Sequence, residues 1–277
     1  MSQRHSHTMT SIQLPGLIDP HDLSTDRQFS MNLARGMQVL RAFSVREPLL
    51  GNRELADKTG LPKPTISRLT YTLTLLGYLS RDTRLKKYRL GTGVLSLGQP
   101  LLASIRVRQS ARPLMEELAK QTGCNVNLGM RDRADVVYID TVRSDTGNPY
   151  LPDIGSTRPL ISSAIGRSLI LACPPTERSA ILNYLKLHNP EYFQQCRNAW
   201  EIDVKLFSKQ GYCHAHGEWQ KEIHAVAVPI RLPTQEIPVA MNCTIASVRN
   251  PNEKLIRHAL PRLKNTVRQL EMLYGMD

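Results

Sequence analysis

The segment from Leu61 to Leu69, LPKPTISRL, places one arginine, Arg68, among small hydroxyl side chains and carries no carboxylate. Arginine suits a bidentate contact with guanine in the major groove, and hydroxyl groups donate to phosphates or base edges. A carboxylate at the same place would repel the phosphate backbone. These residue types therefore indicate recognition of nucleic acid. The alternative, an ordinary solvent-exposed helix face, normally mixes both signs of charge.

The prolines of this segment define where its helix begins. A residue that precedes proline is disfavoured in the helical region, so Lys63 is predicted to lie outside the helix, and Pro64 suits its first position. Gly60 suits the left-handed end of the preceding helix. The residues between these points are therefore predicted to form the short turn of a helix-turn-helix.

Helical periodicity sorts the side chains of residues 64–76 onto two faces, at about 100° per residue. The apolar face, predicted to be buried, contains Ile66, Leu69, Leu73 and Leu76. The opposite face contains Pro64, Ser67, Arg68 and Tyr71, with Thr72 and Thr74 on its flanks. This face holds a cation, hydroxyl donors and an aromatic tip, which favours a DNA-reading helix.

The neighbouring residues complete a winged helix-turn-helix. A helix over residues 32–43 has Leu33, Met37, Leu40 and Phe43 on one face, and residues 52–59 form a second helix. After the third helix, GYLSRDTRLKKYRLG reads as two short strands around a tip at Asp82–Thr83. Arg81 and Arg84 flank that tip and are predicted to contact phosphate or the minor groove. A solubilising edge strand accounts for Lys86 or Lys87.

The charge of the chain is concentrated in this region. The 277 residues include 36 Lys and Arg and 24 Asp and Glu, a net charge of +12. Residues 31–112 alone hold 15 basic and 4 acidic side chains. A patch confined to one domain indicates a polyanionic partner, with nucleic acid as the first candidate and an anionic membrane surface as the second. The membrane alternative lacks a basic amphipathic helix with aromatic anchors.

Targeting signals, cysteine spacing and local composition indicate the location of the protein and the limits of its domains. The sequence shows neither a secretory signal nor an apolar run long enough for a membrane span. Its five scattered cysteines form no CxxC pair, which favours reduced thiols and a cytoplasmic location. Residues 1–30 are predicted to be a disordered tail, and residues 93–112 a linker helix, with Pro113 starting the next helix. Residues 113–277 mix strands and helices, as in an antiparallel sheet with helices packed on it.

Two further patterns could carry chemistry. Cys213, His214 and His216 could be metal ligands, with His224 approaching from a neighbouring strand. In a strand, however, Cys213 points away from the two histidines, so plain surface or pocket-lining roles are favoured and no metal is predicted. The chain contains no nucleophile elbow, dinucleotide motif, P-loop or zinc-protease motif. We therefore predict that it is not an enzyme.

Several motifs in order resemble the IclR family of transcriptional regulators, from about Met31 to the C-terminus. They are MNLARGMQVLRAF, RELADKTGLPKPTISRL, YRLGTGVLSLG, GSTRPLISSAIGRSLILA and KQGYCHAHGEWQKEIHAVAVPI. The resemblance implies an α+β protein with an N-terminal winged helix-turn-helix joined by a linker helix to a GAF-like α/β effector domain. It also implies dimers or tetramers on palindromic operators and an effector that is usually an organic or aromatic acid.

The resemblance implies an effector pocket at a helix start and two strands. Its predicted residues are Arg158, Ser162, Ser163, Ala164, Ile165, Ala225, Asn242 and Thr244. A helix N-terminus suits a carboxylate. The sequence departs from the family at Pro64, where a serine is frequent, so Thr65 becomes the first candidate phosphate contact. It departs also at Ile161, where a histidine is frequent, and at Cys213–His216, where acidic residues are common. Arg158 then becomes the cation nearest to the predicted pocket that could bind an acid ligand. The alternative is that Arg158 belongs to a structural ion pair.

These observations predict a regulator without a cofactor, whose binding to double-stranded operator DNA is modulated by a small carboxylic acid. Its domains are predicted at residues 31–92, 93–112 and 113–277, and its homo-oligomer is a dimer or tetramer that does not bind membranes. The predicted DNA-binding residues are Lys63, Thr65, Ser67, Arg68, Tyr71, Thr72, Arg81 and Arg84. The alternatives are a basic architectural DNA-binding protein without a ligand, and an enzyme acting on a small acid.

Overall fold

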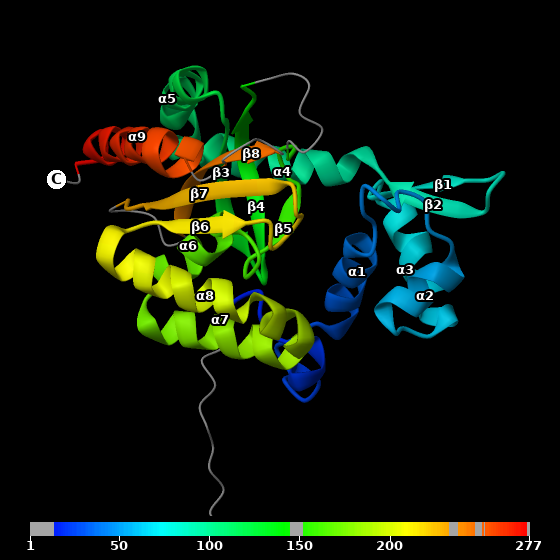
Figure 1. Cartoon of the computed structure of the whole chain (residues 1–277). Helices are drawn as coiled ribbons and strands as arrows, with labels where there is room; N and C mark the ends of the chain where they lie inside the picture. The colour runs from blue at the N-terminus through cyan, green and yellow to red at the C-terminus, as the bar shows by residue number, and fades with distance from the viewer. Residues whose placement is uncertain (1–13, 145–151, 233–237, 247–250, 252, 276–277) are drawn as a thin grey trace, which may run out of the picture. The chain divides into compact units, whose positions relative to one another are not determined.

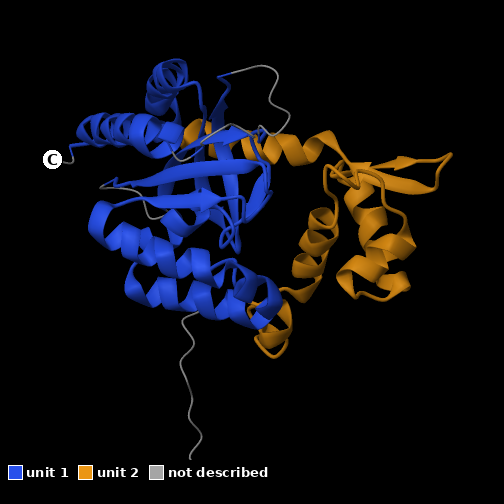
Figure 2. Cartoon of the chain, in the orientation of Figure 1, with its two compact units in different colours: residues 1–17, 106–277 blue, residues 18–105 orange. Residues whose placement is uncertain are grey.

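The computed structural model describes residues 14–144, 152–232, 238–246, 251 and 253–275. The chain forms two compact units, shown in different colours in Figure 2. After the roles predicted from the sequence, we call residues 18–105 the DNA-reading unit and residues 1–17 with 106–277 the effector unit. The boundary between Ile105 and Arg106 lies inside the predicted linker.

The DNA-reading unit consists of three helices, a two-stranded hairpin and a fourth helix (Figure 1). Its elements are the 3₁₀ turn η1 (Pro20–Leu23), α1 (Met31–Arg41), α2 (Asn52–Thr59), α3 (Lys63–Leu75), β1 (Leu79–Asp82), β2 (Lys87–Leu90) and α4 (Thr92–Ser104). The strands β1 and β2 pair antiparallel, and Leu50 adds a bridge to Tyr88. This is the predicted winged helix-turn-helix.

The turn between α2 and α3 follows from its glycine and prolines. Gly60 ends α2 with a left-handed φ of 70°, which glycine adopts without steric cost. The carbonyl of Pro62 accepts the first helical hydrogen bond from the N–H of Ile66 at 3.0 Å. The helix therefore begins at Lys63, one residue earlier than predicted, because that bond encloses Lys63 in its first turn.

The core of the DNA-reading unit confirms part of the predicted apolar faces and corrects the rest. Ile66, Leu73 and Phe43 are buried, and so is Thr70, whose hydroxyl donates to the carbonyl of Ile66 at 2.9 Å. The prediction that Leu33, Met37 and Leu76 are buried is wrong, since these residues are 67%, 44% and 62% exposed. Periodicity marks an apolar face, but it does not say whether this chain covers that face.

The connection to the effector unit is two helices rather than one. α4 ends at Ser104, and Ile105 leaves the helical region with ψ 86° before α5 (Arg106–Thr122) begins. Pro113 lies inside α5, so the prediction that it starts a helix is wrong. Val107, Ala111, Met115 and Leu118 form a buried stripe at helical spacing that spans the proline. Burial of this stripe offsets the hydrogen bond lost at Pro113, a loss of about 3 kcal/mol in a helix interior.

The effector unit is a mixed α/β domain built on a six-stranded antiparallel sheet, ordered β5-β4-β3-β8-β7-β6. The strands are β3 (Asn125–Asp132), β4 (Asp135–Val142), β5 (Thr157–Pro159), β6 (Cys213–His216), β7 (Ile223–Ile230) and β8 (Val239–Ala246). The helices are α5, α6 (Ala164–Ala172), α7 (Pro175–His188), α8 (Pro190–Gln210) and α9 (Leu260–Met272), with a π-helical turn η2 (Glu253–Ala259) before α9. The predicted α+β class is confirmed.

Helices cover both faces of this sheet (Figure 1). α5 and α9 pack on one face, while α6 packs on the other and is itself covered by α7 and α8. The central pairing joins β3 to β8, which are far apart in sequence, and sets Asn127 opposite Asn242. One face of the central strands thus meets α6, where a cavity lies.

A short stretch before the DNA-reading unit belongs to the effector unit. Leu14 is 8% exposed and lies in the same apolar cluster as Val136, Tyr138 and Leu160. Gly16 takes a φ of 85° beside Arg133, where a Cβ would come within 2.9 Å of the arginine Cγ. The prediction of a disordered tail is therefore wrong for residues 14–30, because two leucines anchor its end and η1 follows. Residues 1–13 of that predicted tail lie outside the described residues.

Within the described parts of the chain, no helix combines the length and the apolar character needed to cross a membrane.

Candidate nucleic-acid interface and binding cavity

The outward face of α3 has the predicted composition. Ser67, Arg68, Tyr71 and Thr72 are exposed, as is Lys63 at the helix start, while Thr65 is half-buried. The tip of the Tyr71 ring projects with 67% of the residue accessible. The face holds no carboxylate, so its field favours an anionic partner.

Two of the predicted DNA-binding hydroxyl groups on α3, those of Ser67 and Thr72, are already engaged. The Asn52 side-chain amide on α2 donates to Ser67 Oγ at 3.1 Å, and the Thr72 hydroxyl donates to the carbonyl of Arg68 at 3.0 Å. The Ser67 hydroxyl acts only as an acceptor in its bond, so its proton can still be donated to a partner. The Thr72 hydroxyl already donates its proton to a carbonyl of its own helix. Arg68 and Tyr71 are exposed on the same face, and their side chains take no part in these two bonds.

The hairpin presents its cations in two ways. Arg81 and Arg84 are exposed, and Asp82 caps the turn by accepting the N–H of Leu85 at 2.9 Å. Lys87 instead points back to the unit and pairs with Glu54 at 2.6 Å. The backbone N–H of Gly51 and the ammonium group of Lys87 hold the pKa of Glu54 below its usual value. Lys87 therefore ties the hairpin to α2, while Arg81 and Arg84 stand exposed beside the tip.

Every carboxylate of residues 31–112 is occupied within the described structure. Glu47 pairs with Lys58, Glu54 with Lys87 and Asp57 with Arg53, and Asp82 caps the hairpin turn. Over the same described residues, Lys63, Arg68, Arg81 and Arg84 have no ion-pair partner. The same is true of the described residues Arg35, Arg41, Arg46, Lys86, Arg89 and Arg106. The uncompensated charge therefore lies on α3 and the hairpin and also elsewhere in this segment.

A cavity of about 40 Å³ lies in the effector unit between the sheet and the N-terminus of α6. Its polar lining residues are Asn127, Tyr138, Arg158, Ser162, Ser163, Trp219, Asn242 and Thr244. Its apolar lining residues are Pro152, Ala164, Ala215, Ile223 and Ala225. Burial raises the pKa of Tyr138 to about 12, so its phenol stays protonated and can donate a hydrogen bond.

The N-terminus of α6 is fixed tightly at the cavity. Ser163 caps the helix: its Oγ accepts the N–H of Gly166 at 3.1 Å and donates to the carbonyl of Pro159 at 3.0 Å. Gly166 lies against Leu160, where a Cβ would come within 2.2 Å of the carbonyl oxygen. Only glycine permits this approach. Ser163 and Ala164 line the cavity, so the positive dipole end of α6 lies beside it.

Arg158 and Trp219 meet at the cavity wall. The Arg158 guanidinium lies over the Trp219 ring, 4.1 Å from its centroid, and also donates to the carbonyl of Thr157 at 2.8 Å. A cation over an indole face is attracted by the ring quadrupole. This contact holds the Arg158 guanidinium at the cavity wall.

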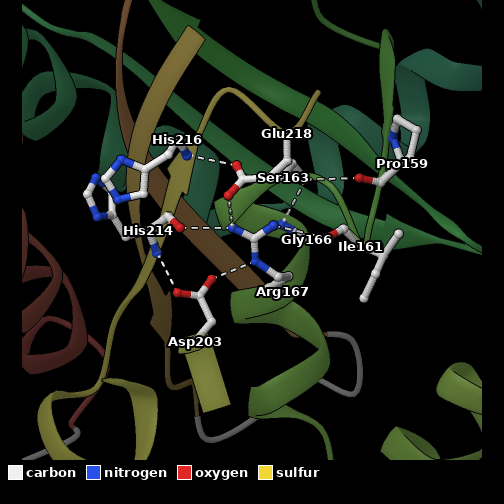
Figure 3. A network of polar contacts seen from close by, with 9 residues as sticks. All are labelled: Pro159, Ile161, Ser163, Gly166, Arg167, Asp203, His214, His216 and Glu218. Atoms are coloured by element: carbon white, nitrogen blue, oxygen red, sulfur yellow. Dashed lines mark hydrogen bonds and ion pairs between the residues drawn. The ribbon is translucent and has the colours of Figure 1, made fainter. Parts of the chain in front are cut away.

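A buried ionic network supports the same walls (Figure 3). Arg167 of α6 and Asp203 of α8 are both fully buried and pair at 2.6 Å. The guanidinium also donates to the carbonyls of Ile161 at 3.0 Å and His214 at 2.9 Å. Asp203 in turn accepts the N–H of His214 at 2.9 Å. One arginine thus ties the loop before α6, α8 and the edge strand β6 together.

The network extends to the loop that carries Trp219. Glu218 lies 3.9 Å from the Arg167 guanidinium and accepts the N–H of His216 at 2.7 Å (Figure 3). Burial raises the pKa of Asp203, while the charge of Arg167 opposes that shift. Buried charges of this kind are tolerated when their hydrogen bonds are complete, as they are around Asp203. The sequence analysis did not identify Arg167, Asp203 or Glu218.

The histidines of β6 and β7 form a ring cluster. The rings of His214 and His216 are 3.7 Å apart, and those of His216 and His224 are 6.3 Å apart. Burial, together with the charges of His216, Arg167 and His224, lowers the pKa of His214 to about 3. Cys213 faces the core instead. Across the described part of the chain, no group of three or more His, Cys, Asp or Glu side chains is arranged to hold a metal.

The cavity brings together most of the predicted effector residues. Seven line it, namely Arg158, Ser162, Ser163, Ala164, Ala225, Asn242 and Thr244. Ile165 does not, since it is fully buried in the core. The sequence analysis missed Asn127, Tyr138 and Trp219. Alternation along β3 could have marked Asn127, but its neighbour β8 is not evident from the sequence.

A basic winged helix-turn-helix joined to an effector-type α/β unit defines a class of protein, the bacterial transcriptional regulators. Comparison with known proteins agrees. Residues 32–83 match the IclR helix-turn-helix domain, and residues 99–272 match the bacterial transcriptional regulator IclR C-terminal domain. The chain belongs to the IclR family.

The similar proteins include regulators and solved structures. The HTH-type transcriptional regulator TsaQ1/TsaQ2 of Comamonas testosteroni is 31% identical over 87% of this chain and 87% of its own length. An IclR family regulator from Brucella abortus is 39% identical, with a TM-score of 0.85 over 94% of this chain and 99% of that chain. An IclR homologue from Microbacterium hydrocarbonoxydans, complexed with 4-hydroxybenzoate, shares the fold at 21% identity, with a TM-score of 0.66 over 87% and 98% of the two chains.

Proposed function

We propose that this IclR-family regulator reads double-stranded operator DNA with α3 and the hairpin, and that a small organic acid bound in the effector unit modulates that reading. The observation that carries the proposal is the pairing of two features in one chain. One is a carboxylate-free helix face, and the other is a cavity at a helix N-terminus with Arg158 in its wall. Such a protein works in the cytoplasm, where its DNA lies.

The proposed DNA contacts divide by chemistry. Arg68, with Tyr71 beside it, reads base edges in the major groove, since an arginine forms bidentate bonds with guanine. Arg81 and Arg84 contact phosphates, which positions the unit without reading sequence. Lys63, Thr65, Ser67 and Thr72 lie at the helix start or on its flanks and add backbone contacts. Of these, Ser67 keeps a free donor while Asn52 holds it in place.

The cavity supports an acid as the effector. Arg158 and the N–H groups at the start of α6 suit a carboxylate, and the aromatic rings of Tyr138 and Trp219 suit an aromatic body. The Microbacterium homologue with 4-hydroxybenzoate supports an aromatic acid by analogy. The cavity of about 40 Å³ is far smaller than the ~300–1,000 Å³ of typical ligand sites, so binding requires its wall to move.

The uncovered apolar face of the DNA-reading unit supports a homo-oligomer. None of the residues of α4 is buried, and Leu95, Leu97 and Leu101 are 78%, 60% and 62% exposed. A groove of about 580 Å³ joins Leu97 of this helix to the exposed Leu33 and Met37 of α1. Its remaining wall includes Arg68 and Thr72 of α3, so only the side formed by α1 and α4 is proposed as the interface. Apolar patches of this kind mark interfaces. The proposed occupant is the same face of a second copy, which matches a palindromic operator.

Ile105 is the proposed joint for the response. A ligand shifts operator affinity only if it binds two conformations unequally. α5 packs on β3 and β4, whose residues Asn127 and Tyr138 line the cavity. Movement of that wall therefore reaches α5 and, through the non-helical residue Ile105, α4. A change at this joint would alter the spacing of two DNA-reading units in a dimer.

A mobility-shift titration tests the proposal. Purified protein should retard a DNA fragment selected from a random pool, and one acid of an aromatic and aliphatic panel should change the midpoint. The acid should be recovered unchanged, which excludes turnover. Retardation without any response to acids would instead support an architectural DNA-binding protein, and absence of retardation at low salt would overturn the DNA-reading role.

A further inference from the structure

Asn127 leaves one hydrogen-bond acceptor unused at the cavity. The residue lies on β3 and is fully buried. Its amide nitrogen donates to Asn242 Oδ1 at 2.8 Å and faces Thr244 Oγ1 at 3.5 Å. Its Oδ1 is buried and has no hydrogen-bond partner among the described residues. A buried polar atom without a partner destabilises the state in which it stays unpaired.

The surrounding bonds fix which end of the amide is left over. The Thr244 hydroxyl donates to the carbonyl of Asn125 at 3.4 Å, so Thr244 offers only lone pairs to Asn127. Asn242 also presents its carbonyl oxygen to Asn127. With the Asn242 amide in this orientation, both neighbours meet the nitrogen of Asn127. An exchange of the two atoms of the Asn127 amide alone would set oxygen against oxygen at both places.

The polar groups on the other side of the cavity are of the opposite kind. Arg158 and the N-terminus of α6 attract an anion, and Ser163 Oγ is already used as both donor and acceptor. Arg158 stands on β5 and Asn127 on β3, two strands away. Arg158 pairs with Val136 and Val136 with Arg131, which lies four residues along β3 from Asn127. At ~4.8 Å between strands and ~3.3 Å per residue, the two backbones are roughly 16 Å apart. A ligand that meets both residues must carry a carboxylate at one end and a donor at the other.

We infer that the cavity selects carboxylic acids bearing a hydroxyl or amino donor at the end remote from the carboxylate, with Asn127 Oδ1 as the specificity-determining acceptor. This inference rests on the proposed function, because it assumes that the cavity is the effector site. An acid that lacks the donor would occupy the cavity beside Asn127 Oδ1 without donating a hydrogen bond to it. Unpaired buried acceptors of this kind reduce affinity by about 5- to 100-fold.

Matched ligands test the inference on the unaltered protein. 4-Hydroxybenzoate and 4-aminobenzoate carry a donor opposite the carboxylate, while benzoate and 4-fluorobenzoate have similar size and none. 6-Hydroxyhexanoate and hexanoate form the corresponding aliphatic pair. Isothermal titration should show the donor-bearing members binding at least about fivefold more tightly.

Two variants assign the preference to its residue. Asn127→Leu removes the acceptor, so it should bring the two members of each pair to the same affinity, with the acid lacking a donor bound no more weakly than before. Asn198→Leu is the matched control: Asn198 is exposed on α8 and does not line the cavity, so the preference should persist. Circular dichroism verifies that both variants are folded, and the wild-type comparison stands even where a variant is not.

The possible outcomes distinguish a failure of the role of Asn127 from a failure of the proposed acid effector. Equal affinities within every pair on the wild-type protein would overturn the role of Asn127 while leaving an acid effector in place. A preference that survives in folded Asn127→Leu would do the same. If no acid of either series binds, the proposed acid effector fails and this inference fails with it.

Discussion

The guanidinium of Arg158 lies 4.1 Å from the ring centroid of Trp219, so the cation at the cavity wall rests on an aromatic face. A carboxylate entering the cavity would compete with that indole for the same charge. Because the chain has 2 tryptophans, Trp200 and Trp219, the competition can be followed by fluorescence.

Replacing this cation should weaken acid binding. Arg158→Gln removes a charge-assisted hydrogen bond, which contributes about 1.5–3 kcal/mol. The affinity for the best-binding acid, measured by titration of the Trp219 emission in a Trp200→Phe background, should fall accordingly. Arg197→Gln is the control, since Arg197 is exposed on α8 and pairs with Glu201. An unchanged affinity in Arg158→Gln would show that Arg158 serves only to hold Trp219.

Removing Arg68 should reduce sequence discrimination. A good bidentate pair contributes about 1–3 kcal/mol, so Arg68→Ala should weaken binding to the selected DNA by that amount and binding to scrambled DNA much less. Fluorescence anisotropy with both duplexes at one salt concentration measures the difference. Equal losses on the two duplexes would reassign Arg68 to the phosphate backbone.

Removing Arg84 should act on all sequences alike. Each phosphate contact contributes about −0.9 to the slope of log affinity against log salt concentration. Arg84→Ala should therefore lower the magnitude of that slope by about one, with the same effect on selected and scrambled DNA. Lys87→Ala provides a contrast, because Lys87 is paired with Glu54. A sequence-selective loss at Arg84 would contradict the phosphate assignment.

Substituting exposed leucines of α4 by charged residues should dissociate the proposed oligomer. Leu95 and Leu101 are 78% and 62% exposed, so Leu95→Asp with Leu101→Asp disturbs no packing in the single chain. Sedimentation equilibrium should report a smaller assembly, and the variant should still melt near the wild-type temperature. Leu187→Asp, at an exposed leucine of α7, is the matched control. An unaltered mass would place the oligomer interface elsewhere.

His214 should make the effector unit sensitive to acid. Its folded pKa of about 3 lies below the ordinary 6.5, because burial disfavours the charged ring. The unfolded chain binds the proton first, so this contribution to stability is present above pH 6.5 and is lost as the pH falls toward 3. The slope is at most about 1.4 kcal/mol per pH unit.

Urea unfolding, followed by the two tryptophans of the effector unit, measures this contribution. His214→Gln should flatten the difference in unfolding free energy between pH 6.5 and pH 4, whereas the exposed His188→Gln should leave it as in wild type. Parallel curves for wild type and His214→Gln would mean that His214 gains a proton in the folded state.

The helix-turn-helix could be predicted from local signals, since Gly60 and the two prolines fix a turn whatever surrounds it. The cavity could be predicted only in part. Its α6 side is one continuous segment, but Asn127 and Asn242 meet because β3 pairs with β8, which follows from long-range packing. The exposed Leu76 and the buried Arg167 show the same limit, because hydrophobicity alone does not tell which surface covers a residue.

Residues 14–17, which we call the strap, affect how domains can be exchanged between related proteins. Because these residues close the apolar cluster of the effector unit, the DNA-reading unit is inserted into that unit between Leu17 and Arg106. A chimera made with a single crossover near residue 105 would carry one parent's strap on the other parent's core. We therefore expect hybrids with two crossovers, one on each side of the inserted unit, to be more stable than those with one.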